Sequence, residues 1–313
     1  MIAISDQLHL NLDAVIKASA QSVTSKVKNT AARDRILSFI GTKDHAFFGK
    51  LTYIHGMLFA VEQKRTEQFI EDLHKLAAAV ELYALSFDIF DDLEDQDNFT
   101  EPWMQIPSGE ALNLSTLIYT ISLQMLTEAD RSGSLVSLVN NYSINAMIGQ
   151  HEDLTFYAAT EEACLEMTKR KSGSLIAMAS MTGVMYSTQH FEPIVEEYAT
   201  QFGVAAQIDN DYRDLFHTHK SDLAAKKNTL ALLYIKREFN DASKELLQFI
   251  ENGNSIEQQF GSLKAYKEVL HKTGVIHYLN VMKQIAVQKA LANLNRLPFP
   301  ADQIEIIKSH LIK

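Results

Sequence analysis

The stretch SFDIFDDLEDQDNF (residues 86–99) places six acidic side chains among apolar ones. A helix advances about 100° per residue, so acids at positions i, i+3, i+4 and i+7 share one face. Four of them have this spacing: Asp88, Asp91, Asp92 and Asp95. The opposite side carries Ile89, Phe90 and Leu93, which can anchor the helix in a core. The stretch therefore predicts a helix with an acidic face and an apolar face.

Neighbouring carboxylates raise one another's pKa, so this cluster needs a counter-charge. The spacing of an EF-hand is absent, because Leu93 and Phe99 interrupt it. Helical carboxylates that each supply one or two oxygens suit Mg²⁺, which keeps most of its waters and binds together with substrate phosphates. The stretch alone leaves two interpretations open, a magnesium site and a solvated acidic helix end.

Composition limits the possible functions. The chain has 313 residues, is 46% hydrophobic and carries a net charge of -10. This charge, without any stripe of Lys or Arg, argues against a nucleic-acid partner. Cys164 is the only cysteine, which excludes disulfides within the chain and cysteine metal clusters. The first residues have the pattern of neither a signal peptide nor a membrane span, so we expect a cytoplasmic protein.

The apolar residues follow the helical period over long stretches, and no segment has the pattern of a strand. The clearest stretches are residues 67–93, 108–129, 193–216 and 275–297. Short breaks rich in Gly, Pro, Ser, Asp or Asn separate them and are too short to be domain linkers. We therefore predict an all-α protein, with residues 1–313 forming a single-domain bundle of about ten helices.

A second constellation lies in QFGVAAQIDNDYRDLF (residues 201–216), more than a hundred residues downstream. Its polar side chains repeat the spacing i, i+3, i+4 and i+7. They are Gln207, Asn210, Asp211 and Asp214. Two helices with matched polar faces, each embedded in apolar sequence, predict the opposing walls of one metal–diphosphate site.

These motifs resemble those of the isoprenyl diphosphate synthases, in the same order along most of the chain. DDLED (91–95) is similar to the family's first aspartate-rich motif and residues 207–214 to its second, with Asn210 in place of an Asp. GQHEDL (149–154), KSGSL (171–175) and SDLAAKKNTL (221–230) are similar to three further family elements. The resemblance implies the all-helical isoprenoid synthase fold of trans-prenyltransferases and a Mg²⁺-dependent transfer of isoprenyl groups.

The resemblance also implies roles for individual residues. Acids of both motifs would be catalytic: Asp91, Asp92, Asp95 and Asp211. The Mg²⁺ ligands would be Asp91, Asp92, Asp95, Asn210, Asp211 and Asp214. The substrates would contact Lys50, Lys171, Gln207, Lys227 and Phe87. Phe87 lies about one helical turn before Asp91, where it either limits the pocket to a geranyl or farnesyl tail or is ordinary core.

The elements that hold a second diphosphate in chain-elongating members are incomplete. Gly49 and Lys50 survive in FFGKLTYIHG (47–56), but both arginines of that element are missing, and QDNFTEPWMQI (96–106) contains no arginine. A second diphosphate needs such cations to offset the repulsion from the first. We therefore expect an uncharged acceptor, for which an aromatic nucleophile suits an allylic cation. Trp103 either lines the acceptor's entrance or packs against the bundle.

This combination is similar to a bacterial branch of the superfamily that prenylates a tryptophan of a peptide pheromone precursor, a signal for quorum sensing and competence. The expected partners are an allylic prenyl diphosphate and such a peptide. The alternatives are a chain-elongating prenyl diphosphate synthase, a terpene cyclase, or a silent helical partner subunit. The family commonly forms dimers, and a lipid-like donor is compatible with a weak peripheral membrane contact, although the sequence shows no basic anchor.

Overall fold

The computed structural model describes residues 12–155, 157–216, 223 and 226–311. Within these ranges every regular element is a helix and no strand occurs, so the all-α prediction is confirmed. None of the helices in the described ranges is long and apolar enough to cross a membrane.

The chain forms two compact units. The first unit comprises Met1–Ser143, Leu175–Glu196 and Leu294–Lys313, and the second comprises Ile144–Ser174 and Glu197–Asn293. The organisation of residues 1–313 as one domain stays a prediction. Four helices contribute residues to both units: α7 (Ser134–Leu154), α9 (Ser174–Thr188), α10 (Pro193–Asp214) and α15 (Val275–Leu294).

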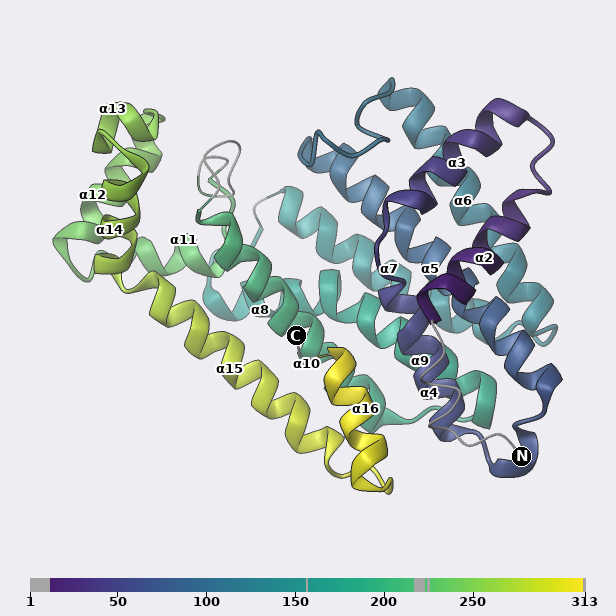
Figure 1. The fold of residues 1–313 in the computed structure, drawn as a ribbon. Helices are drawn as coiled ribbons and strands as arrows, with labels where there is room; N and C mark the ends of the chain where they lie inside the picture. Colours follow the sequence, from purple (N-terminus) through teal and green to yellow (C-terminus); the bar gives the residue numbers. More distant parts are fainter. Residues whose placement is uncertain (1–11, 156, 217–222, 224–225, 312–313) are drawn as a thin grey trace. The chain divides into compact units, whose positions relative to one another are not determined.

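The first unit is built around α5 (Glu67–Asp95), which packs against α2, α4 and α6 (Figure 1). Its other helices are α2 (Leu12–Thr24), α3 (Thr30–Thr42), α4 (Phe47–Phe59), the short 3₁₀ helix η1 (Glu62–Lys64), α6 (Ser108–Ala129), most of α9 (Ser174–Thr188) and α16 (Ala301–Leu311).

The sequence of α5 explains its central place. Thr66 caps its first turn, because the hydroxyl oxygen accepts a hydrogen bond from the Phe69 amide. The middle of the helix, Leu76–Val80, is buried on every side. A helix that is apolar all round must lie inside a core, and its polar end then reaches the surface of that core. α5 thereby carries the acidic stretch to the edge of the first unit's core.

The second unit contains α8 (Glu161–Thr168), a π-helical turn (Lys169–Gly173), α11 (Leu230–Ile235), α12 (Asp241–Asn252), α13 (Ile256–Phe260) and α14 (Leu263–Thr273), with most of α10 and α15. Its apolar core includes Ile208, Leu246, Leu270 and Leu279. Ile208 lies on α10 beside Gln207, so packing of this core fixes the rotation of the helix that carries the second polar constellation.

Candidate active site

The first acidic cluster lies at the carboxyl end of α5 in the first unit. The helix predicted there is confirmed, since α5 runs to Asp95, and Ile89 is buried as its apolar anchor. Asp88 pairs with Lys43, whose Nζ lies 2.6 Å from its Oδ2. Asp92 is only 6% exposed and is therefore part of the core edge rather than of the solvated surface.

The chain reverses direction after α5 and closes over Asp92. Gln96 and Asn98 have positive φ angles of 54° and 45°, which turn the backbone back on the helix end. The Asn98 amide donates to Asp92 Oδ1 at 2.6 Å, and the Trp103 indole donates to Asp92 Oδ2 at 2.7 Å. Trp103 is 1% exposed and packs edge-on against Phe39. Of its two expected roles, packing against the bundle is confirmed.

The cluster accumulates negative charge. Burial raises the pKa of Asp92, and the nearby charges of Asp88 and Asp91 raise it further. Burial, followed by the charges of Asp92 and Asp95, raises the pKa of Asp97 to about 7. Oδ1 of Asp97 is buried and has no hydrogen-bond partner among the described residues. A bound cation would relieve both features.

These acids suit a divalent cation that is bound by only a few protein ligands. In the part of the chain that the structure describes, no three His, Cys, Asp or Glu side chains converge into a closed metal site. Mg²⁺ does not need one, because it binds through one or two carboxylates together with waters and substrate phosphates. Asp91, Asp92 and Asp95 carry carboxylate oxygens of the kind that such an ion prefers at this end of α5, and Asp97 lies beside them.

The second polar constellation lies on α10 in the second unit. The Gln207 amide donates to Asp211 Oδ1 at 3.0 Å, and its carbonyl accepts a hydrogen bond of 2.6 Å from the Ser172 hydroxyl. Asp211 is 8% exposed, whereas Asn210 is exposed and Asp214 is half-buried. The helix predicted here is confirmed by α10. The facing arrangement of the two constellations stays a prediction.

Two of the predicted phosphate-binding lysines meet at one carboxylate. The Nζ atoms of Lys171 and Lys227 lie 3.0 Å and 3.4 Å from Oδ2 of Asp153. Burial alone would raise the pKa of Asp153, but the two lysine charges outweigh it and hold that pKa below its usual range. Asp153 therefore stays ionised and draws two cations together. The two amines therefore lie close together in the second unit, where they can bind an anion.

A π-helical turn, Lys169–Gly173, carries Lys171 of this pair. A Cβ on Gly149 would lie 2.4 Å from the Lys171 amide nitrogen, so only glycine allows α7 to approach the turn this closely. Arg170 pairs with Glu152 on α7 at 2.7 Å beside the Lys171 contact. π-turns inside helices often mark functional positions. Here the turn presents two successive cations to two successive acids of α7.

Phe87 lies in an aromatic cluster of the first unit. Its ring stacks on Tyr83 with centroids 5.2 Å apart, and Tyr119 lies 5.0 Å from Tyr83. The Tyr83 hydroxyl is hydrogen-bonded to Ser143. Phe87 is half-buried, so its two expected roles, pocket floor and core, both stay open as predictions.

Lys50, on α4, contacts Asp13 of α2, a partner that the sequence did not reveal. Sequence analysis also assigned no role to Asn98 or Asp97, because both lie in the turn after the end of the helical pattern. It assigned no role to Asp153 either. Neighbouring acids in GQHEDL were the available signal for Asp153. Residues 217–222, 224 and 225, which precede and interrupt the element around Lys227, lie outside the described residues.

Comparison with known proteins agrees with the predicted resemblance. Residues 49–286 match the family model of the polyprenyl synthetases. The tryptophan prenyltransferase ComQ of Bacillus spizizenii is 34% identical over 275 residues, which cover 88% of this chain and 96% of that protein. The tryptophan prenyltransferase ComQ of Bacillus subtilis strain 168 is 34% identical over 290 residues, covering 93% and 95%.

Solved structures share the fold. A geranylgeranyl pyrophosphate synthase has a TM-score of 0.82 at 16% identity and covers 100% of this chain and 98% of its own. A polyprenyl synthetase from Streptomyces coelicolor A3(2) has a TM-score of 0.79 at 18% identity, covering 95% and 96%. The isoprenoid synthase fold that the motifs implied is therefore confirmed.

Proposed function

The chain belongs to the polyprenyl synthetase family, and we propose that it transfers a geranyl or farnesyl group from its diphosphate to a tryptophan of a ComX-like peptide pheromone precursor. The observation that carries this proposal is the 34% identity with tryptophan prenyltransferases over nearly the whole chain. The product would then act as a signal in quorum sensing and competence.

The donor side of the reaction needs cations around the leaving diphosphate. Lys171 and Lys227 bind its outer oxygens, and Asp153 keeps both amines in place before the substrate arrives. Mg²⁺, when bound, supplies further positive charge that neutralises the leaving group. The lysines stabilise the charge that develops as the carbon–oxygen bond breaks, so this step needs no general base.

The metal ligands in this proposal come from both constellations. On α5 they are Asp91, Asp92 and Asp95, and on α10 they are Asn210, Asp211 and Asp214. The Asn98 and Trp103 hydrogen bonds orient the carboxylate of Asp92. Gln207 orients Asp211 in the same way through its amide. Each constellation thus carries one buried acid whose position is fixed by its own neighbours.

The acceptor side is poor in cations. The region from Gln96 to Ile106 has no arginine, and Lys50 contacts Asp13. An indole needs no counter-charge and is electron-rich, so it attacks the allylic carbon. A carbon–carbon bond forms as diphosphate leaves, and the substituted indole then loses its charge when the peptide's backbone nitrogen closes a ring and releases its proton.

The relatives favour this function over chain elongation or cyclisation. The matched curated ComQ proteins are tryptophan prenyltransferases, and the missing arginines are those that a second diphosphate would need. Mg²⁺ as the particular metal, a homodimer and a weak peripheral membrane contact complete the proposal as predictions.

The test uses the full chain with Mg²⁺, geranyl or farnesyl diphosphate and a tryptophan-containing ComX-type peptide. Mass spectrometry should show one prenyl group on the peptide, located on tryptophan by fragmentation. A peptide with Trp replaced by Phe is the matched control and should stay unmodified. Prenylation of the control, or an unmodified tryptophan peptide with both donors, would refute the proposal.

A further inference from the structure

The amino end of α4 is held by two carboxylates from other helices. Asp13 of α2 accepts a hydrogen bond from the Ala46 amide at 2.7 Å through Oδ1, while its Oδ2 contacts the Lys50 amine. Glu81 of α5 accepts a hydrogen bond from the Gly49 amide at 2.8 Å. Ala46 itself offers no side-chain cap, so these distant acids satisfy the free amides of the first turn.

The contact between Asp13 and Lys50 is well shielded. Their side chains are 23% and 20% exposed. Burial would raise the pKa of Asp13, but the hydrogen bonds from Lys50 and the Ala46 amide outweigh this effect and lower that pKa. His45 Nδ1 lies 3.6 Å from the same carboxylate. Asp13 is therefore an anion at neutral pH, and the charge of Lys50 is already matched.

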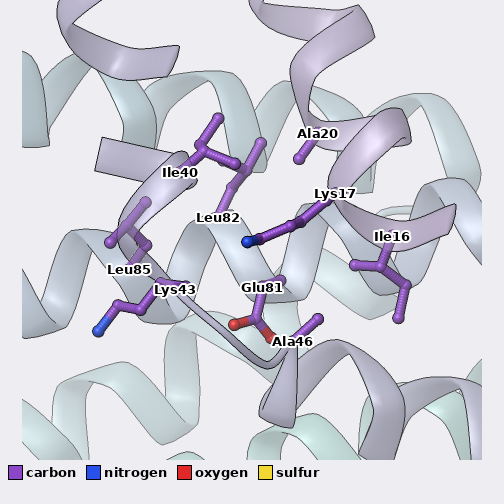
Figure 2. Close-up of a pocket in the computed structure, with 9 residues that line it drawn as sticks. All are labelled: Ile16, Lys17, Ala20, Ile40, Lys43, Ala46, Glu81, Leu82 and Leu85. Carbon is purple, nitrogen blue, oxygen red and sulfur yellow. The ribbon is translucent and has the colours of Figure 1, made fainter. Parts of the chain in front are cut away.

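The surviving Gly49 has a packing role that is unrelated to phosphate. A Cβ at this position would lie 2.7 Å from the Ala77 carbonyl oxygen of α5, so glycine is what allows α4 to lie against α5. The cavity beside Ala46 and Glu81 has a volume of about 20 Å³, which is room for about one water molecule. Figure 2 shows Lys17 reaching over this cavity towards Glu81, while Lys43 points away.

We propose that Asp13 is a specificity-determining residue, whose carboxylate takes the place of an external anion on Lys50 and so excludes a second diphosphate. The inference rests on the proposed function in one respect, since it explains why the acceptor must be uncharged. The exclusion of the anion is itself a property of the folded chain and can be measured without any peptide.

The test measures binding of isopentenyl diphosphate to the full chain by titration calorimetry in Mg²⁺, without an allylic donor. Asp13→Asn keeps an oxygen that can accept the Ala46 hydrogen bond and removes only the charge. This variant should bind isopentenyl diphosphate about two- to fivefold more tightly than the wild type, the scale of one partly exposed ion pair. The gain should disappear in the double variant Asp13→Asn, Lys50→Gln.

Two comparisons control this test. Asp34→Asn removes an acid of α3 whose side chain is 70% exposed, and its affinity should equal that of the wild type. Lys50→Gln in the wild-type background leaves the charge of Asp13 unpaired, so this variant should bind isopentenyl diphosphate no more tightly than the wild type. If Asp13→Asn folds poorly, Asp13→Ser, whose hydroxyl can accept the Ala46 hydrogen bond, replaces it in the test.

The inference is overturned if folded Asp13→Asn binds like the wild type, or if its tighter binding persists in the double variant Asp13→Asn, Lys50→Gln. Either result would show that Asp13 does not exclude the diphosphate by occupying Lys50. Failure to prenylate a tryptophan peptide would instead refute the proposed function and leave the anion-binding result standing, so the two ideas fail separately.

Discussion

The indole nitrogen of Trp103 donates a hydrogen bond to Asp92 Oδ2 at 2.7 Å, across a distance of eleven positions in the chain. The other oxygen of Asp92 is held by Asn98 at 2.6 Å. Both oxygens of one acid in the aspartate-rich motif are thus oriented from inside the protein. The region where chain-elongating relatives of the family would carry arginines supplies instead a neutral donor to the same motif.

Replacing Trp103 by Phe should keep the ring packed on Phe39 and remove only the donor. A hydrogen bond to a charged group contributes about 1.5–3 kcal/mol, so we expect turnover of peptide prenylation to fall by roughly tenfold or more. Steady-state kinetics with both substrates saturating measures this. Phe39→Leu, which loosens the packing and keeps the indole, should have a smaller effect on turnover. If Trp103→Phe turned over at the wild-type rate, catalysis would not depend on the hydrogen bond by which the indole orients Asp92.

Before the diphosphate binds, the carboxylate of Asp153 should pair with the two lysines that the diphosphate contacts. Asp153→Asn leaves Lys171 and Lys227 without their shared anion, so the variant should melt at a lower temperature than the wild type. Inorganic diphosphate with Mg²⁺ should raise its melting temperature by more than it raises that of the wild type. Glu152→Gln, which removes the neighbouring acid paired with Arg170, is the control and should respond like the wild type. Equal shifts in Asp153→Asn and wild type would contradict the pairing.

Gly149 tests the close contact at the π-helical turn. Gly149→Ala places a Cβ 2.4 Å from the Lys171 amide nitrogen, and overpacking of this kind destabilises by about 1–3 kcal/mol. Gly41→Ala, within α3, meets no atom within 4 Å and should be neutral or stabilising by up to about 1 kcal/mol. Urea unfolding of both variants gives the comparison. A Gly149→Ala protein as stable as Gly41→Ala would show that the turn can move away.

Glu81 makes stability depend on pH. Burial raises the pKa of Glu81 to about 7, above its ordinary value of 4.5. The folded state therefore holds this proton more tightly than the unfolded state, and stability decreases as pH rises between about 4.5 and 7. Glu81→Gln should reduce the difference in melting temperature between pH 5 and pH 8. If the melting temperature of the variant depended on pH as that of the wild type does, burial would not raise the pKa of Glu81.

The sequence predicted what depends on local pattern. The helical spacing of Asp88 to Asp95 and the second polar face around Gln207 both fall on helices, α5 and α10. The motif containing Gly149 also lies where the close contact requires glycine. These features follow from periodicity and residue type within one segment.

The contacts that complete the site could not be predicted in this way. Asp13 meets Lys50 because α2 and α4 pack together, and no spacing in the chain encodes that meeting. Trp103 reaches Asp92 only because left-handed residues Gln96 and Asn98 reverse the chain. Both are tertiary contacts between segments whose motif spacing does not relate them to each other.

The most direct measurement offers both acceptors to the full chain in a single tube. Purified protein, Mg²⁺ and farnesyl or geranyl diphosphate are mixed with equal concentrations of isopentenyl diphosphate and a tryptophan-containing ComX-type peptide, and the products are quantified by mass spectrometry. We predict prenylated peptide and no elongated diphosphate. Elongated diphosphate beside an unmodified peptide would identify a chain-elongating synthase and contradict the account.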